Sequence, residues 1–151
     1  MATARHIFHH AVLSALIRFS DGKPRPPERF RRKLALWQQT NGEGRLVQKV
    51  PERAFSPPSE FALRMGDFSS EGVVVMMSNI TWRIDCTLHF EIVEEPAPGM
   101  VRVLTSFTGN DELLHLAPDM ASAQAWMARN AHGGLRLEIV GETPSEGRDA
   151  A

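Results

Sequence analysis

The sequence predicts an α+β protein: an antiparallel sheet of about five to six strands, with two N-terminal helices and one C-terminal helix packed mainly on one face. Apolar residues recur every three to four positions over the first 40 residues, and the period changes to two after residue 43. Strands then follow one another with no clear helix before residue 119, which is typical of α+β domains. With 151 residues, 42% of them hydrophobic, the chain is long enough to bury one core.

Two helices are predicted in the basic N-terminal part. Residues 5–19 place their apolar side chains on one wide stripe. After a turn-rich connector, a second helix over about 27–40 begins with Pro27 in its first turn and ends at Asn41-Gly42. Its buried stripe is expected to comprise three apolar residues, Phe30, Leu34 and Trp37.

Alternation of apolar and polar residues predicts the strands. The clearest alternation runs over 81–94, where even-numbered side chains from Trp82 to Ile92 are apolar and are expected inside. Residues 100–107 are expected to pair antiparallel with that strand across a short loop, and 109–118 fit either a short helix or a short strand. The expected strands span 44–50, 60–66, 72–78, 81–94, 100–107 and 135–140.

A third helix is predicted over about 119–132, with Asp119 as its N-cap and Gly133-Gly134 at its end. Prolines make 51–59 a loop, because Pro57-Pro58 cannot lie in a central strand. The polar composition of 142–151 predicts a disordered tail.

The domain prediction follows from these elements. Residues 1–141 are expected to form a single α+β domain. Within it, 1–42 is the basic helical part and 43–141 the sheet-rich part.

Charge divides the chain, although its net charge is only −1. Residues 1–54 carry a net charge of +7, and residues 55–151 carry −8. Such asymmetry predicts either a basic binding surface or attraction between the two halves, and the residues alone leave both readings open. Six bases gather within eleven residues of the connector and the second helix: Lys23, Arg25, Arg29, Arg31, Arg32 and Lys33.

Motifs for catalysis or metal binding are weak. His6 and His10 stand at i and i+4 and could share a metal, but no third ligand is marked, so we expect neither a metal nor another cofactor. Cys86, the single cysteine, shares its strand face with apolar residues and is expected to pack in the core rather than act as a nucleophile. No nucleophile elbow and no phosphate-binding loop occurs in the sequence, so we assign no catalytic residue and expect a protein that is not an enzyme.

The predicted function is that of a non-enzymatic bacterial accessory, adaptor or inhibitor protein that binds a larger protein or protein complex. Charge bipolarity without a catalytic pattern carries this prediction. One alternative is DNA or RNA binding through the basic segment 23–33. A second is a small-molecule-binding or catalytic pocket on the wet face of the sheet, formed by Arg83, Asp85 and His89.

The expected location is the bacterial cytoplasm. Arginine outnumbers lysine fourteen to three, which indicates a GC-rich genome. No apolar stretch approaches the ~20 residues needed to span a bilayer, so no membrane association is expected. The lone cysteine agrees with a reducing compartment.

Overall fold

The computed structural model describes residues 2–52, 58–70, 73–107, 109–130 and 134–141. The described pairings between its strands are all antiparallel, which confirms the α+β class. The expectation that the helices pack mainly on one face stays a prediction. In chain order the elements are α1 (Ala4–His10), β1 (Leu16–Ser20), α2 (Arg31–Gln38), β2 (Gly42–Val50), β3 (Glu60–Ser70), β4 (Val73–Arg83), β5 (His89–Glu94), β6 (Val101–Phe107), β7 (Asn110–Ala117), α3 (Met120–Arg129) and β8 (Arg136–Ile139).

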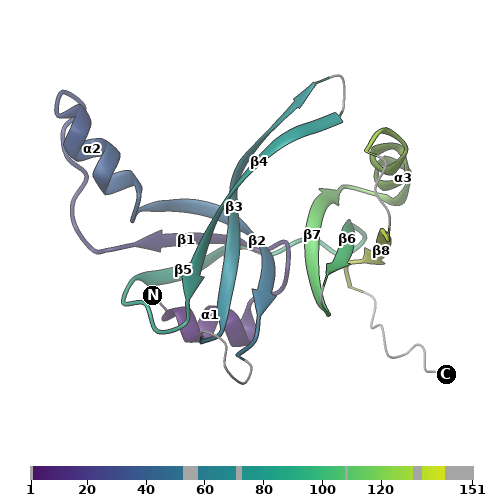
Figure 1. The fold of residues 1–151 in the computed structure, drawn as a ribbon, viewed down its shortest axis with the longest axis horizontal. Coiled ribbons are helices and arrows are strands. Elements are labelled where there is room, and N and C mark those ends of the chain that lie inside the picture. The colour runs from purple at the N-terminus through teal and green to yellow at the C-terminus, as the bar shows by residue number, and fades with distance from the viewer. Residues whose placement is uncertain (1, 53–57, 71–72, 108, 131–133, 142–151) are drawn as a thin grey trace.

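The eight strands form one sheet that divides at β2. Its order is β4-β3-β2-β7-β6-β8, and β1 joins β2 to β5. The first part of β2 pairs with β1, whereas Gln48 further along pairs with Glu112 of β7. The chain therefore has an N-terminal half, α1 to β5, and a C-terminal half, β6 to β8 with α3, which lie side by side in Figure 1.

Each half has its own apolar core, and a third cluster joins them. Phe19, Phe61 and Phe90 are buried in the N-terminal half. Val103 and Ala123 are buried in the C-terminal half, where α3 packs against β6 and β7. Across the junction, Val47 of β2 packs with two leucines of the C-terminal half, Leu104 and Leu113.

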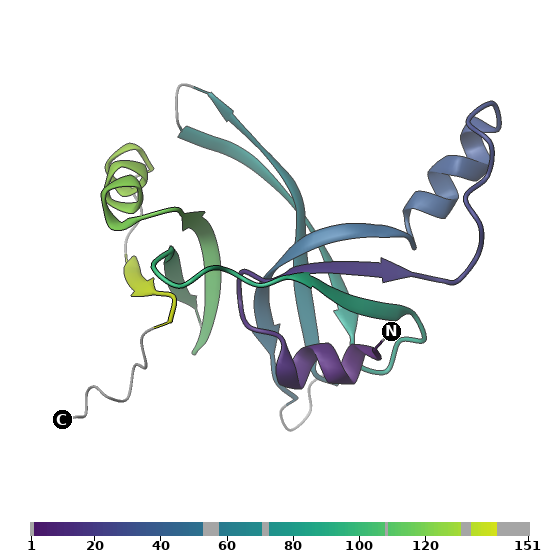
Figure 2. The ribbon, with the colours of Figure 1, turned by 180° about the vertical axis from the view of Figure 1, so that it is seen from behind.

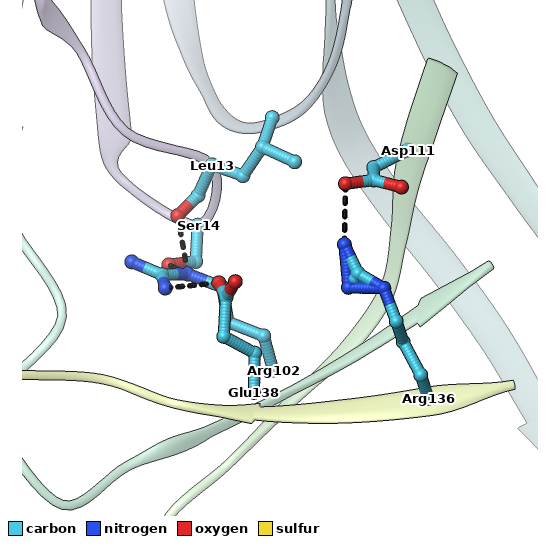
Figure 3. A network of polar contacts seen from close by, with 6 residues as sticks. All are labelled: Leu13, Ser14, Arg102, Asp111, Arg136 and Glu138. Atoms are coloured by element: carbon cyan, nitrogen blue, oxygen red, sulfur yellow. Dashed lines mark hydrogen bonds and ion pairs between the residues drawn. The ribbon is translucent and has the colours of Figure 1, made fainter. Parts of the chain in front are cut away.

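A polar network at Ser14 also joins the halves (Figure 3). Ser14 is buried and is the one non-glycine residue in the described ranges with a positive φ, 83°. Arg102 Nε of β6 donates to the Leu13 carbonyl oxygen at 2.9 Å and to Ser14 Oγ at 3.1 Å, while Arg45 Nη1 of β2 donates to the Ser14 carbonyl oxygen at 2.9 Å. Glu138 of β8 holds Arg102 from the other side, at 2.7 Å.

The predicted helix over 5–19 is wrong beyond His10. The helix α1 ends there, and residues 16–20 form β1, which pairs with β2 on one side and β5 on the other. Ile17 and Phe19 are buried while Arg18 is exposed, which is the period of a strand. The apolar run fits both periods. The helix ends where Ala11 adopts an extended conformation, and the left-handed Ser14 lies between that end and the start of β1.

The predicted continuous strand over 81–94 is also wrong, although its alternation is confirmed. The strand β4 ends at Arg83, the chain turns, and β5 begins at His89. From Trp82 to Ile92, every even-numbered residue is nonetheless buried or half-buried, and every odd-numbered residue is exposed. The predicted pairing of 100–107 with this segment is wrong, because β6 pairs with β7 and β8.

The remaining elements follow the predictions more closely. The ambiguous segment 109–118 forms the strand β7, which with β1 raises the strand number to eight. Asp119 caps α3 as predicted, accepting a hydrogen bond from the Ser122 backbone N–H at 2.8 Å. The helix α2 is shorter than predicted, and residues 142–151 and most of 51–59 lie outside the described residues. None of the helices in the described ranges is long and apolar enough to cross a membrane.

Candidate functional site

A helical arm leaves the body between β1 and β2 (Figures 1 and 2). Phe19 and Gly42 still pair across the two strands, so residues 21–40 are an excursion from the end of a β-ladder. No residue of α2 is buried. We call residues 21–40 the basic arm, because it carries all six clustered bases, each of them exposed: Lys23, Arg25, Arg29, Arg31, Arg32 and Lys33.

Hydrogen bonds fix the base of the basic arm. Asn41 is buried, and its amide donates to the Trp37 carbonyl oxygen at 2.9 Å and accepts from Ser20 Oγ at 2.9 Å. Trp37 Nε1 donates to the Lys23 carbonyl oxygen at 2.8 Å, so the helix is tied to its own connector. The Lys23 backbone N–H, with help from Asn41, holds the pKa of the Asp21 carboxyl below its ordinary value. Hydrogen bonds thus connect the arm to the end of the sheet, although no residue of its helix is fully buried.

One side of α2 presents apolar and cationic groups together. Arg32, Lys33 and Leu36 lie on one helix face, because residues three and four apart are neighbours. Leu36 is 58% exposed. Phe30, at the helix N-cap and 41% exposed, has Arg29 Cζ 4.8 Å and Lys33 Nζ 5.2 Å from its ring centroid. We call these residues the binding stripe: Arg29, Phe30, Arg32, Lys33 and Leu36.

The predicted buried stripe of this helix is therefore wrong at Phe30. Leu34 and Trp37 are half-buried, whereas Phe30 is exposed. Trp37 is engaged with Lys23 and has Arg25 Cζ 5.9 Å from its ring centroid. Since the arm projects from the sheet, Phe30 has no core to enter.

Across the described ranges, the salt bridges do not join the arm's bases to carboxylates of the acidic half of the chain. Within the described residues, Arg25 alone of the six bases lies within 4.0 Å of a carboxylate, that of Glu28 at 3.8 Å on the same arm. Attraction between the two halves of the sequence occurs instead on the sheet, where Arg18 lies 3.3 Å from Glu91 and Arg45 lies 3.9 Å from Glu94. The basic arm remains a concentrated positive surface.

A cavity of about 400 Å³ lies where the arm meets the sheet. Phe19 and Trp37 give it aromatic walls, and Arg18, Arg25 and Glu43 line it with charge. The lining residues Arg25 and Trp37 belong to the same arm that carries the binding stripe.

A second cavity, of about 350 Å³, lies where β7 diverges from β2 and β3. Arg45 of β2, Arg64 of β3 and His115 of β7 line it together with leucines. The His115 ring stacks on Trp126, with centroids 5.0 Å apart and planes 5° from parallel. The sequence analysis did not find these residues, because they lie on three different strands and form no motif with a recognisable spacing along the chain.

The three residues of the predicted sheet-face pocket are exposed. Arg83 and Asp85 form an ion pair with each other at 2.9 Å, and His89 lies on β5 beside Ser20 of β1. None of the three lines either cavity described above.

The histidine and cysteine candidates are placed as follows. The rings of His6 and His10 lie with centroids 4.5 Å apart on α1. In the described part of the chain, no group of three or more His, Cys, Asp or Glu residues is placed to hold a metal ion. Cys86 is half-buried against the N-terminal core, and burial raises the pKa of its thiol.

Fold and site together define a small α+β protein with an antiparallel sheet and a projecting basic helix. Over residues 2–144 the chain matches the family described as Uncharacterised conserved protein UCP036055, and it belongs to that family. No curated protein and no solved structure matches it.

Proposed function

We propose that the protein is a non-enzymatic accessory protein of the bacterial cytoplasm that docks on a larger protein through its basic arm. The observation that carries this proposal is the exposure of Leu36 and Phe30, at 58% and 41%, on a helix with no buried residue. A helix of eight residues is too short to be stable alone, and most helical stability comes from packing an apolar face. A partner surface would supply that packing.

The binding stripe indicates the chemistry of the partner. Its cations surround two large apolar side chains, so the complementary surface is an apolar recess with an acidic rim. Buried apolar anchors supply most of the affinity of such interfaces, and rim charges mainly speed association. The cavity between Phe19 and Trp37 could receive one side chain of the partner in return.

Leu36 favours a protein over a nucleic acid. Six exposed bases on one arm would also suit a phosphate backbone. A phosphate backbone, however, offers an exposed leucine less apolar surface to bury than a recess in a protein does. Nucleic-acid binding is therefore the alternative that the experiment must separate.

Photo-crosslinking from the arm tests the proposal. A photoreactive amino acid replaces Leu36 and, as a control, Ala125, which is exposed on α3. The protein is expressed in its native host and the cells are irradiated. We expect one protein adduct from position 36, none from position 125, and loss of the adduct when Arg29, Arg32 and Lys33 are changed to Glu.

Two results would overturn the proposal. The first is an adduct from position 36 that nuclease removes and protease does not, since that result identifies a nucleic acid. The second is an equal yield of the same adduct from both positions, or one that survives the triple charge reversal.

A further inference from the structure

We infer that the cavity between β2, β3 and β7 binds a small organic carboxylate with an apolar body. This site lies apart from the basic arm and does not depend on the proposed function. Its volume of about 350 Å³ falls within the ~300–1,000 Å³ usual for small-ligand sites. Its lining combines two guanidinium groups with four apolar side chains, Met100, Leu113, Leu114 and Leu116.

The main observation is that the guanidinium of Arg45 has unused hydrogen-bonding capacity. Arg102 and Arg136, the arginines of the neighbouring network, have carboxylates of Glu138 and Asp111 within hydrogen-bond distance (Figure 3). For Arg45 the nearest carboxylate, that of Glu94, lies 3.9 Å away, beyond hydrogen-bond distance. Within the described residues, the one hydrogen bond of its side chain goes to the Ser14 carbonyl oxygen. Since a guanidinium has five N–H donors, Arg45 keeps capacity for a two-oxygen acceptor.

The second guanidinium is held in place by the fold. Arg64 Nη1 donates to the Leu114 carbonyl oxygen at 2.9 Å, and its Nε lies 3.4 Å from Asn79 Oδ1. The side chain is only 9% exposed, so its charge acts in a largely desolvated setting. Its position does not have to be fixed anew when a ligand enters, which lowers the entropic cost of binding.

The surrounding charges favour a monoanion. Glu94 and Glu112 lie 3.9 Å and 3.8 Å from the two arginines and are more exposed than they are, so they offset only part of the positive charge. A dianionic phosphate would meet stronger repulsion from these carboxylates than a single carboxylate would. The leucines and Met100 require an apolar body on the same molecule, because a bare ion would leave their surface wet.

Calorimetric titration of the full chain with octanoate tests this inference. Octanol, which has the apolar body without the charge, and inorganic phosphate, which has charge without the body, are the comparison ligands. We expect saturable one-to-one binding of octanoate, at least about tenfold tighter than either comparison ligand, since each 1.4 kcal/mol is tenfold.

Three variants locate the site. Arg45→Gln should weaken octanoate binding about tenfold or more, by loss of a charged hydrogen-bond pair. Leu116→Trp keeps both arginines but fills the cavity and should abolish binding. Arg83→Gln, which removes an exposed arginine outside the cavity, should leave the Kd unchanged. Arg45 also holds Ser14, so if Arg45→Gln does not fold, Leu116→Trp decides the question.

The inference is overturned if octanol binds as tightly as octanoate, if phosphate binds as tightly, or if octanoate does not bind. Unchanged binding in folded Leu116→Trp would also overturn it.

Discussion

Arg102 of β6 shares one Nε–H between the carbonyl oxygen of Leu13, at 2.9 Å, and the hydroxyl of Ser14, at 3.1 Å. These atoms belong to opposite halves of the molecule (Figure 3). The sheet itself joins the halves through the pairing of β2 with β7 at Gln48 and Glu112. Side-chain hydrogen bonds therefore join the halves in addition to this pairing and to the apolar cluster around Val47.

Replacing Arg102 should destabilise the fold strongly. Arg102→Met keeps the apolar stem but leaves the Leu13 carbonyl oxygen and the Glu138 carboxylate without their donor, which should cost about 2–4 kcal/mol. Arg136→Met is the matched control, because its ion pair with Asp111 is exposed and should contribute less than about 1 kcal/mol. Urea unfolding measures both, and equal losses would contradict the importance of the junction.

Ser14 should tolerate glycine better than alanine. Both changes remove the hydroxyl, but only glycine adopts a φ of 83° without steric cost, which is about 1–2 kcal/mol for other residues. After the extra chain entropy of glycine, Ser14→Gly should be about 0.5 kcal/mol more stable than Ser14→Ala. At the neighbouring Ala15, where φ is not positive, glycine should instead destabilise by about 1 kcal/mol. Thermal melts of the three variants give the order, and a more stable Ser14→Ala would show that φ is not positive there.

Leu36 should contribute little to folding. Leu36→Ala should change the free energy of unfolding by less than about 0.5 kcal/mol, because the side chain is 58% exposed. Leu46→Ala removes the same atoms from a fully buried site in β2 and should cost about 2–5 kcal/mol. Denaturant midpoints compare the two. A loss at Leu36 close to that at Leu46 would mean that the arm is packed rather than free to bind.

Cys86 should react slowly with thiol reagents in the folded protein. Burial raises the pKa of its thiol, so at pH 8 the folded chain holds less thiolate than the unfolded chain. Labelling with a chromogenic disulfide should therefore be at least about tenfold slower than in urea and should accelerate as the pH rises. The raised pKa also makes the free energy of unfolding depend on pH. The stabilisation that comes from keeping this thiol protonated is complete below its ordinary pKa and is lost as the pH rises through the raised pKa of the folded state. Equal labelling rates in both states would contradict the burial of Cys86.

The sequence predicts the fold best where the apolar residues fit only one period, either that of a strand or that of a helix. From Trp82 to Ile92 the alternation identifies the inward side chains correctly even across the turn that ends β4. From 5 to 19 two periods overlap, and tertiary pairing of β1 with two neighbours decides between them. The partner of β6 depends on long-range topology, which no local pattern encodes.

The candidate sites divide in the same way. The six bases of the arm are consecutive enough to be found by charge alone, and the structure places them all on the surface. The exposure of Phe30 could not be predicted, because a helical stripe does not reveal that its helix leaves the body. Arg45, Arg64 and His115 come together only because the sheet divides at β2.

The basic arm begins and ends at the same point of the ladder, where Phe19 faces Gly42. A two-residue turn would be long enough to connect these two strands, because they are antiparallel neighbours. Changes at the exposed positions of the arm, such as a reversed charge in the binding stripe, should leave the pairing of β1 with β2 and the core beneath it intact. On the proposed function, an arm exchanged between two proteins of this family should therefore carry its partner preference with it.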